Sequence, residues 1–135
     1  MNLIFYGTLR SKEKVVDMFN VNPTKVIEGH IVGSLFEVSD VTEPNNVFRY
    51  PLFHTDGSDA VSAVLMQFDL TEEEFNHLID KMSEYEGPLY ELKAIIFTSN
   101  DGVLRSGQVF AWKQTRSLES ATISRIQSSN PILWE

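Results

Sequence analysis

The segment Tyr6-Gly7-Thr8-Leu9-Arg10 is the first part of the sequence that is suited to binding a ligand. It follows a short apolar run and precedes a short helix, so the chain turns sharply within a few residues. At such a turn several backbone N–H groups can point at one spot and bind a carboxylate there. Gly7 is required if a side chain would crowd the turn or if its φ is positive. The pattern also fits a tight turn without a ligand, and taken alone it favours that interpretation.

Glu86, at the end of a predicted helix, is the residue best suited to proton transfer. At about 100° per residue it lies roughly 1100° from Phe75, three turns plus about 20°, and so shares the apolar face. Glu84 lies roughly 900° from Phe75 and faces water. A carboxyl group that is buried near a helix C-terminus has a raised pKa, which suits general acid–base catalysis near neutral pH. If the helix frays before Glu86, the side chain is exposed instead, and the sequence leaves both outcomes open.

The other clusters of polar residues do not indicate a metal site. His30, His54 and His77 are far apart in the sequence, and none has a second ligand at i+2 or i+4. This spacing favours solvated or locally hydrogen-bonded histidines. The run Glu72-Glu73-Glu74 falls in the first turn of a predicted helix, where carboxylates stabilise the helix dipole. We therefore expect no bound metal ion.

The elements in the first half of the chain are mostly strands. Residues 3–6 form a short buried strand, and residues 11–19 form a helix with Ser11 as its N-cap. A run of β-branched and aromatic residues predicts a strand over residues 25–38 that bends at Gly29 and Gly33. The segments that follow are a polar loop (39–46), a weak edge strand interrupted by Pro51 (47–53), a turn (55–59) and a strand (60–70).

The clearest helix spans residues 71–85. Thr71 and Glu74 form a capping box, and Gly87-Pro88 ends the helix. Its apolar residues recur at i, i+3, i+4 and i+7, namely Phe75, Leu78, Ile79 and Met82. The remaining chain predicts strands over 90–98 and 107–113 joined by the turn Asn100-Asp101-Gly102, a helix over 117–127, and a tail over 131–134 that docks through Trp134. This order predicts an α+β fold, because a parallel doubly wound sheet requires regular alternation.

Composition restricts the class of protein further. The chain has 135 residues and a mass of 15.4 kDa, which predicts a single domain over residues 1–135. Its net charge of −8 argues against nucleic-acid and anionic-membrane partners, because both require a positive surface. The absence of cysteine excludes disulfides and thiolate chemistry. No apolar run is long enough to span a bilayer and no basic leader precedes the first strand, so we expect a cytoplasmic protein.

Four short motifs, in this order and spacing, resemble the gamma-glutamylcyclotransferase-like family. They are Tyr6-Gly7-Thr8-Leu9, Gly33-Ser34-Leu35-Phe36, Tyr50-Pro51, and Tyr85-Glu86-Gly87 followed by Tyr90. The resemblance implies a small mixed β-barrel with packed helices. It also implies that the loop over residues 6–9 holds the glutamyl carboxylate through backbone groups, and that Glu86 is the catalytic acid and base. The pair Thr8-Leu9 is more similar to the branch that acts on gamma-glutamylamines than to the branch that acts on gamma-glutamyl amino acids.

Four positions depart from the family pattern. Ser83 stands where an aspartate is usual, and Leu92 stands where an arginine is common. Ala63 replaces a glycine of the central strand, and Trp112 replaces a tyrosine of a late strand. None of these changes removes Glu86.

The reaction that the resemblance implies is an intramolecular aminolysis. The free α-amine of a gamma-glutamyl group attacks its own γ-carbonyl, forms 5-oxoproline and releases an amine. In this scheme Glu86 transfers the protons, and the N–H groups of Gly7, Thr8 and Leu9 bind the carboxylate. Tyr6 and Tyr90 serve as pocket walls or hydroxyl donors, and no cofactor is implied.

A second interpretation is a non-catalytic binding or inhibitory protein that keeps the fold and uses its acidic surface. A closed pocket in which Glu86 faces the Gly7 turn would favour the enzyme. A pocket filled by Trp112 or by another side chain would favour the binding protein.

Overall fold

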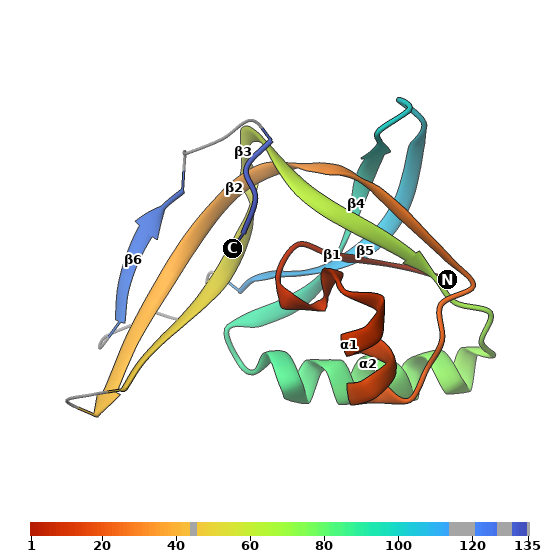
Figure 1. Cartoon of the computed structure of the whole chain (residues 1–135), viewed down its shortest axis with the longest axis horizontal. Helices are drawn as coiled ribbons and strands as arrows, with labels where there is room; N and C mark the ends of the chain where they lie inside the picture. Colours follow the sequence, from red (N-terminus) through yellow and green to blue (C-terminus); the bar gives the residue numbers. More distant parts are fainter. Residues whose placement is uncertain (44–45, 114–120, 127–130, 135) are drawn as a thin grey trace.

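A computed structural model describes residues 1–43, 46–113, 121–126 and 131–134 of the chain. Its centre is a closed ring of five strands in the order β3-β1-β5-β4-β2, which closes because β2 also pairs with β3 (Figure 1). Pairing of β1 with β5 is parallel, and the other pairings are antiparallel. The strands are β1 (Asn2–Phe5), β2 (Lys25–Glu43), β3 (Asn46–Gln67), β4 (Tyr90–Ser99), β5 (Leu104–Trp112) and, outside the ring, β6 (Ala121–Arg125). The α+β fold with a small mixed barrel is therefore confirmed.

Strands β2 and β3 form one long hairpin, where the sequence predicts several shorter pieces. The predicted loop over residues 39–46 belongs mostly to these strands, except for residues 44–45, which lie outside the described residues. The predicted turn over residues 55–59 is a bulge inside β3, because the partner of Gly33 is Asp59 and the partner of Ser34 is His54. Pro51 does not interrupt the strand, since it pairs with Glu37 in register. Continuous pairing with β2 outweighs these local turn signals.

A close contact between β2 and β4 completes the ring. The two strands pair only at Gly29 with Ser99 and at His30 with Thr98. A Cβ atom on Gly29 would lie 2.1 Å from the carbonyl oxygen of Thr98 and 2.6 Å from the ring of Phe97. Glycine is therefore required where these strands meet, as the predicted bend at Gly29 suggests.

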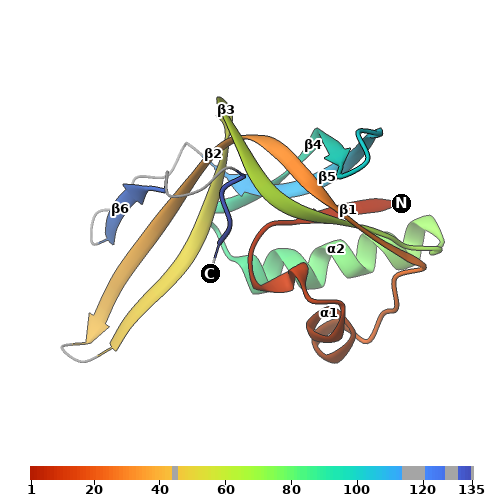
Figure 2. The same ribbon diagram turned by 45° about the horizontal axis from the view of Figure 1, so that its top comes forward.

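Two helices cover one side of the barrel (Figure 2). Helix α1 (Lys12–Phe19) begins at Ser11, whose hydroxyl accepts a hydrogen bond from the N–H of Lys14 at 3.4 Å. Helix α2 (Glu72–Glu86) begins with the predicted capping box, in which Thr71 and Glu74 each accept a 3.1 Å bond from the other's backbone. A short 3₁₀ turn, η1 (Thr8–Arg10), precedes α1.

The alternation of side chains along β1 divides the core into two parts. Ile4 and Tyr6 point into the barrel, and Leu3 and Phe5 point toward the helices. The buried residues inside the barrel include Ile31, Leu35, Phe53, Leu65, Phe97 and Val109. Those under the helices include Phe19, Met66, Leu78, Met82 and Phe110, which confirms the apolar face predicted for α2.

The predicted helix over residues 117–127 is wrong where the structure describes it. Residues 121–125 form β6, which pairs with Phe36 to Asp40 of β2. Residues 114–120 and 127 lie outside the described part. The long β2 strand leaves a free edge beyond the barrel, and pairing with that edge outweighs the weak helix propensity. Arg125 also binds Asp59 at 2.7 Å.

No helix among the described residues has the length and apolar character that crossing a membrane requires. Within the same residues, no three His, Asp or Glu side chains are grouped as a metal ion would need.

Candidate active site

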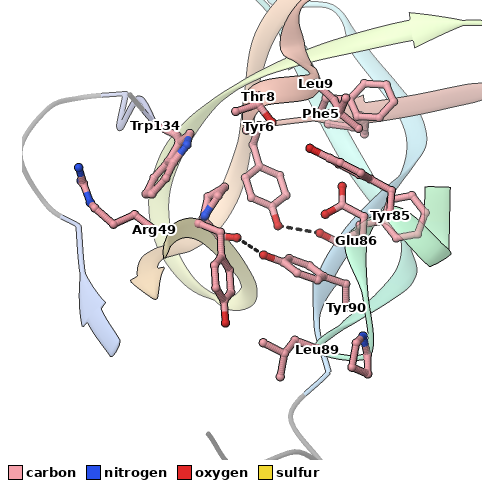
Figure 3. A pocket seen from close by; sticks show the side chains of 16 residues that line it. Phe5, Tyr6, Thr8, Leu9, Arg49, Tyr85, Glu86, Leu89, Tyr90 and Trp134 are labelled. Atoms are coloured by element: carbon pink, nitrogen blue, oxygen red, sulfur yellow. Dashed lines mark hydrogen bonds between the residues drawn. The ribbon is translucent and has the colours of Figure 1, made fainter. Parts of the chain in front are cut away.

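The Gly7 turn and the end of α2 line one pocket, with a volume of about 510 Å³ (Figure 3). Residues 4–9 form one side of it, and the end of α2 with the start of β4 forms another. The Arg49-Tyr50-Pro51 stretch of β3 and Trp134 complete the wall. Two segments that are far apart in the sequence therefore meet at one site. The lining residues are Ile4, Phe5, Tyr6, Gly7, Thr8, Leu9, Arg49, Tyr50, Pro51, Tyr85, Glu86, Pro88, Leu89, Tyr90, Phe110 and Trp134.

Glu86 is the last residue of α2, and its carboxyl group points into this pocket (Figure 3). The helix does not fray before it, because the N–H of Gly87 still donates to the carbonyl of Ser83 at 3.0 Å. Burial raises the pKa of Glu86 from 4.5 to about 7, since the charged form loses solvation. Glu84 is exposed, as its helical position predicts. Glu86 is thus partly buried and turned inward, and the exposed outcome is wrong.

The Gly7 turn owes its glycine to a close neighbour. Gly7 has a φ of −106°, so a positive φ is excluded as the reason. A Cβ atom on Gly7 would lie 2.9 Å from Cγ of Pro51, which is another pocket residue. The carbonyl of Gly7 accepts a 3.1 Å bond from the N–H of Arg10 and closes η1. The N–H groups of Thr8 and Leu9 are the first of that turn, so they have no acceptor within it.

The two predicted tyrosines are held as walls of the pocket. The hydroxyl of Tyr6 donates to the carbonyl of Phe110 at 2.8 Å and accepts from the N–H of Phe53 at 3.2 Å. The hydroxyl of Tyr90 donates to the carbonyl of Pro51. Burial raises the pKa of both groups well above the ordinary tyrosine value. With these partners, the tyrosines shape the site and stay neutral at physiological pH.

The structure adds pocket residues that the sequence reasoning missed. Arg49 donates through Nε to the carboxylate of Glu37, and its guanidinium lies 5.9 Å from the centre of the Trp134 ring. Trp134 is buried, which confirms that the tail docks, but no sequence signal assigned it to the site. Arg10 reaches both Gly7 and Trp134. Arg49 directly precedes the Tyr50-Pro51 motif, and this position is the signal that could have indicated that it lines the pocket.

The four departures from the family pattern lie outside the pocket lining. Ser83 is exposed on α2, and Leu92 packs on the helix side of the core. Ala63 is buried inside the barrel. Trp112 contacts Phe36 and His54, with ring centres 5.9 Å and 5.5 Å apart, so it does not fill the pocket.

Comparisons with known proteins agree on the fold. No protein-family model and no curated protein matches the sequence. A solved structure of a gamma-glutamyl cyclotransferase is similar, with a TM-score of 0.63, 13% identity, and coverage of 91% of this chain and 70% of that chain. An uncharacterized protein from Homo sapiens has a TM-score of 0.56, 14% identity and the same coverage. The allophanate hydrolase of Kluyveromyces lactis has a TM-score of 0.50 at 9% identity, over 93% of this chain and 19% of that chain. The chain therefore has the gamma-glutamylcyclotransferase-like fold.

Proposed function

We propose that the protein is a gamma-glutamyl cyclotransferase that converts a gamma-glutamyl group, such as that of a gamma-glutamylamine, to 5-oxoproline and a free amine. One observation carries the proposal. A carboxyl group with a pKa of about 7, that of Glu86, shares a pocket with the Gly7 turn. The pocket volume of about 510 Å³ is in the range that small-molecule sites occupy.

The substrate α-carboxylate would bind at the Gly7 turn. Thr8 and Leu9 offer backbone N–H groups there that η1 does not use, and such groups bind anions without a cationic side chain. Binding through backbone N–H groups allows a protein with a net charge of −8 to hold an anionic substrate group. The γ-carbonyl would then lie deeper in the pocket, near the carboxyl group of Glu86.

Glu86 would move the protons of the reaction. Near pH 7 a large share of its carboxyl groups is ionised and can accept a proton from the substrate α-ammonium. The freed amine attacks the γ-carbonyl carbon and forms the lactam bond. As the bond to the leaving nitrogen breaks, Glu86 returns the proton to that nitrogen. The attacking nitrogen loses a second proton when it becomes the lactam N–H, and this proton passes to the released amine, so the products are 5-oxoproline and a protonated amine. The reacting atoms belong to one molecule, so folding the substrate correctly supplies much of the rate enhancement.

The alternative, a non-catalytic acidic binding protein, lacks a specific supporting observation. A pocket filled by Trp112 or by another side chain would support it, but Trp112 lies outside the lining and the pocket has a volume of about 510 Å³. It would predict binding without turnover.

The test is incubation with a panel of gamma-glutamyl compounds followed by detection of 5-oxoproline. We expect Glu86→Gln to reduce turnover by at least ~100-fold, because the amide cannot accept the proton. Glu84→Gln, on the exposed face of the same helix, is the matched control and should retain activity. The rate of the parent protein should rise with pH through a limb near 7. Equal activity of Glu86→Gln and the parent would contradict the assignment.

A blocked substrate separates this reaction from hydrolysis. An N-acetylated gamma-glutamylamine keeps its α-carboxylate but has no free amine, so it cannot cyclise. We expect no product from it. Release of free glutamate or N-acetylglutamate from the blocked compound would identify a hydrolase instead.

A further inference from the structure

Arg10 connects the Gly7 turn to a segment from the other end of the chain. Its Nε donates to the carbonyl of Gly7 at 3.0 Å, and its Nη2 donates to the carbonyl of Trp134. A guanidinium is planar and presents several donors in a rigid fork, so it can hold two carbonyl groups in one geometry. A lysine at this position would offer a single flexible ammonium group.

The tail segment, residues 131–134, is held against the barrel by backbone hydrogen bonds and by buried side chains. The N–H of Ile132 donates to the carbonyl of Ala60 at 2.8 Å, and the carbonyl of Ile132 accepts from the N–H of Ser62 at 2.7 Å. The side chains of Ile132 and Trp134 are 3% and 6% exposed, respectively. The acceptor that Arg10 binds on Trp134 is therefore fixed to the barrel.

The same segment contributes to the pocket wall. The indole of Trp134 lines the pocket, and the guanidinium of Arg49 lies over it (Figure 3). Arg10 thus joins two parts of one site, the turn at Gly7 and the wall at Trp134.

From this geometry we propose that Arg10 is a positioning residue, which fixes the Gly7 turn to the docked tail segment for substrate binding. The proposal rests on the proposed function, because it assigns the turn to the gamma-glutamyl carboxylate. Backbone donors bind an anion strongly only when they are held in place before it arrives. Loss of Arg10 removes one of the two hydrogen bonds that the Gly7 carbonyl accepts, and it also releases the turn from the tail segment.

The decisive experiment compares steady-state kinetics of Arg10→Gln, Arg10→Lys and the parent on a gamma-glutamyl substrate that the parent converts. We expect Arg10→Gln to raise KM by about tenfold, the effect of losing a charge-assisted hydrogen bond. The kcat value should stay within about twofold of the parent's. The midpoint of the pH limb near 7 should shift by no more than a few tenths of a pH unit, because Glu86 is held by α2. Arg10→Lys should recover part of the KM effect. Lys12→Gln removes a nearby exposed charge and should leave KM unchanged.

A fluorescence arm reports on the tail segment without requiring activity. In a Trp112→Phe background, Trp134 is the remaining tryptophan, and Arg10→Gln should increase its quenching by acrylamide. An active parent whose KM does not change in Arg10→Gln would overturn the proposal. A parent that forms no 5-oxoproline would overturn the proposed function. The proposed role of Arg10 in substrate binding would then also be overturned. Increased quenching in that case would show only that Arg10 holds the tail segment in place.

Discussion

At the scale of single residues, the site depends on the solvation of one carboxyl group. Burial is the cause of the raised pKa of Glu86, because the charged form of its carboxyl group loses solvation. Placement at a helix C-terminus acts in the same direction, because the helix dipole is negative there. Burial of this kind sets a carboxyl pKa near 7, where one group can both accept and donate a proton.

The first prediction concerns stability as a function of pH. The folded pKa of Glu86 is about 7 and its ordinary value is 4.5, so between these values the folded state holds a proton that the unfolded state has lost. Stability from this group is therefore complete below pH 4.5 and is lost as pH rises to about 7. Glu86→Gln should remove this loss and be more stable than the parent above pH 7, by on the order of 3 kcal/mol.

Urea unfolding at several pH values between 5 and 8.5 would check this prediction. Glu84→Gln serves as the control, since its side chain is exposed and the variant should follow the parent. A constant difference between Glu86→Gln and the parent across this range would show that the carboxyl group is not buried in solution. This test does not depend on the identity of any substrate.

At the scale of elements, the pocket is built by turns and by the ends of strands and helices. The Gly7 turn follows β1, Glu86 ends α2, and Tyr90 begins β4. Pro51 lies between them, because it packs against Gly7 and accepts the hydrogen bond of the Tyr90 hydroxyl. Pro51 therefore links the turn to the wall of the pocket that Tyr90 forms.

The second prediction is that Gly7→Val reduces ligand affinity by at least about tenfold, or ~1.4 kcal/mol. Its side chain would push against Pro51, which lies 2.9 Å from the position of the new Cβ atom. Calorimetric titration with an N-acetylated gamma-glutamylamine would measure the affinity without turnover. Gly102→Ala is the control. The φ of Gly102 is +87°, so an alanine there lowers the stability of the protein. Gly102 lies in the β4–β5 turn, outside the pocket lining, so the variant should not change ligand affinity. Equal loss of affinity in both variants would indicate a general effect of lower stability.

At the scale of the whole molecule, closure of the barrel brings together segments that are remote in the sequence. The ring closes where β2 meets β4 at Gly29, and the tail segment docks beside β3 at Val61. The tail carries Trp134 and β3 carries Arg49 and Pro51, so the docked tail and β3 together form one wall of the pocket.

The third prediction is that Gly29→Ala destabilises the protein by about 2 kcal/mol or more, the scale of overpacking in a core. The new Cβ atom would lie 2.1 Å from the carbonyl oxygen of Thr98 and 2.8 Å from Cα of Ser99, and backbone atoms cannot move aside without shifting β4. Gly107→Ala is the matched control. Its new Cβ atom would meet Cδ1 of Ile4 at 2.9 Å and Cγ1 at 3.1 Å, which are side-chain atoms, whereas the new Cβ atom at Gly29 would meet backbone atoms. Chemical denaturation of both variants would compare the costs, and similar costs would contradict the assigned role of Gly29.

The sequence by itself determined the elements whose signals are local. Capping residues such as Thr71 and Ser11 predicted where helices begin. Helical periodicity predicted that Glu84 faces water and placed Glu86 on the apolar face, but it left open whether the helix frays before Glu86. Short motifs predicted the barrel. The helix starts and the helix faces depend on contacts within one turn of helix, so they can be read without a partner segment. The barrel was predicted only through the family resemblance that these motifs carry.

Only the tertiary structure decided the features that depend on distant partners. Residues 121–125 pair as a strand because β2 extends beyond the barrel and offers a free edge. Gly7 is required because Pro51 of β3 lies against it. Its φ is negative, so backbone conformation is not the reason. Arg10 and Trp134, which are 124 positions apart, meet because the tail docks beside β3. Such contacts arise when the ring closes, and local preferences carry no information about which segments will then be neighbours.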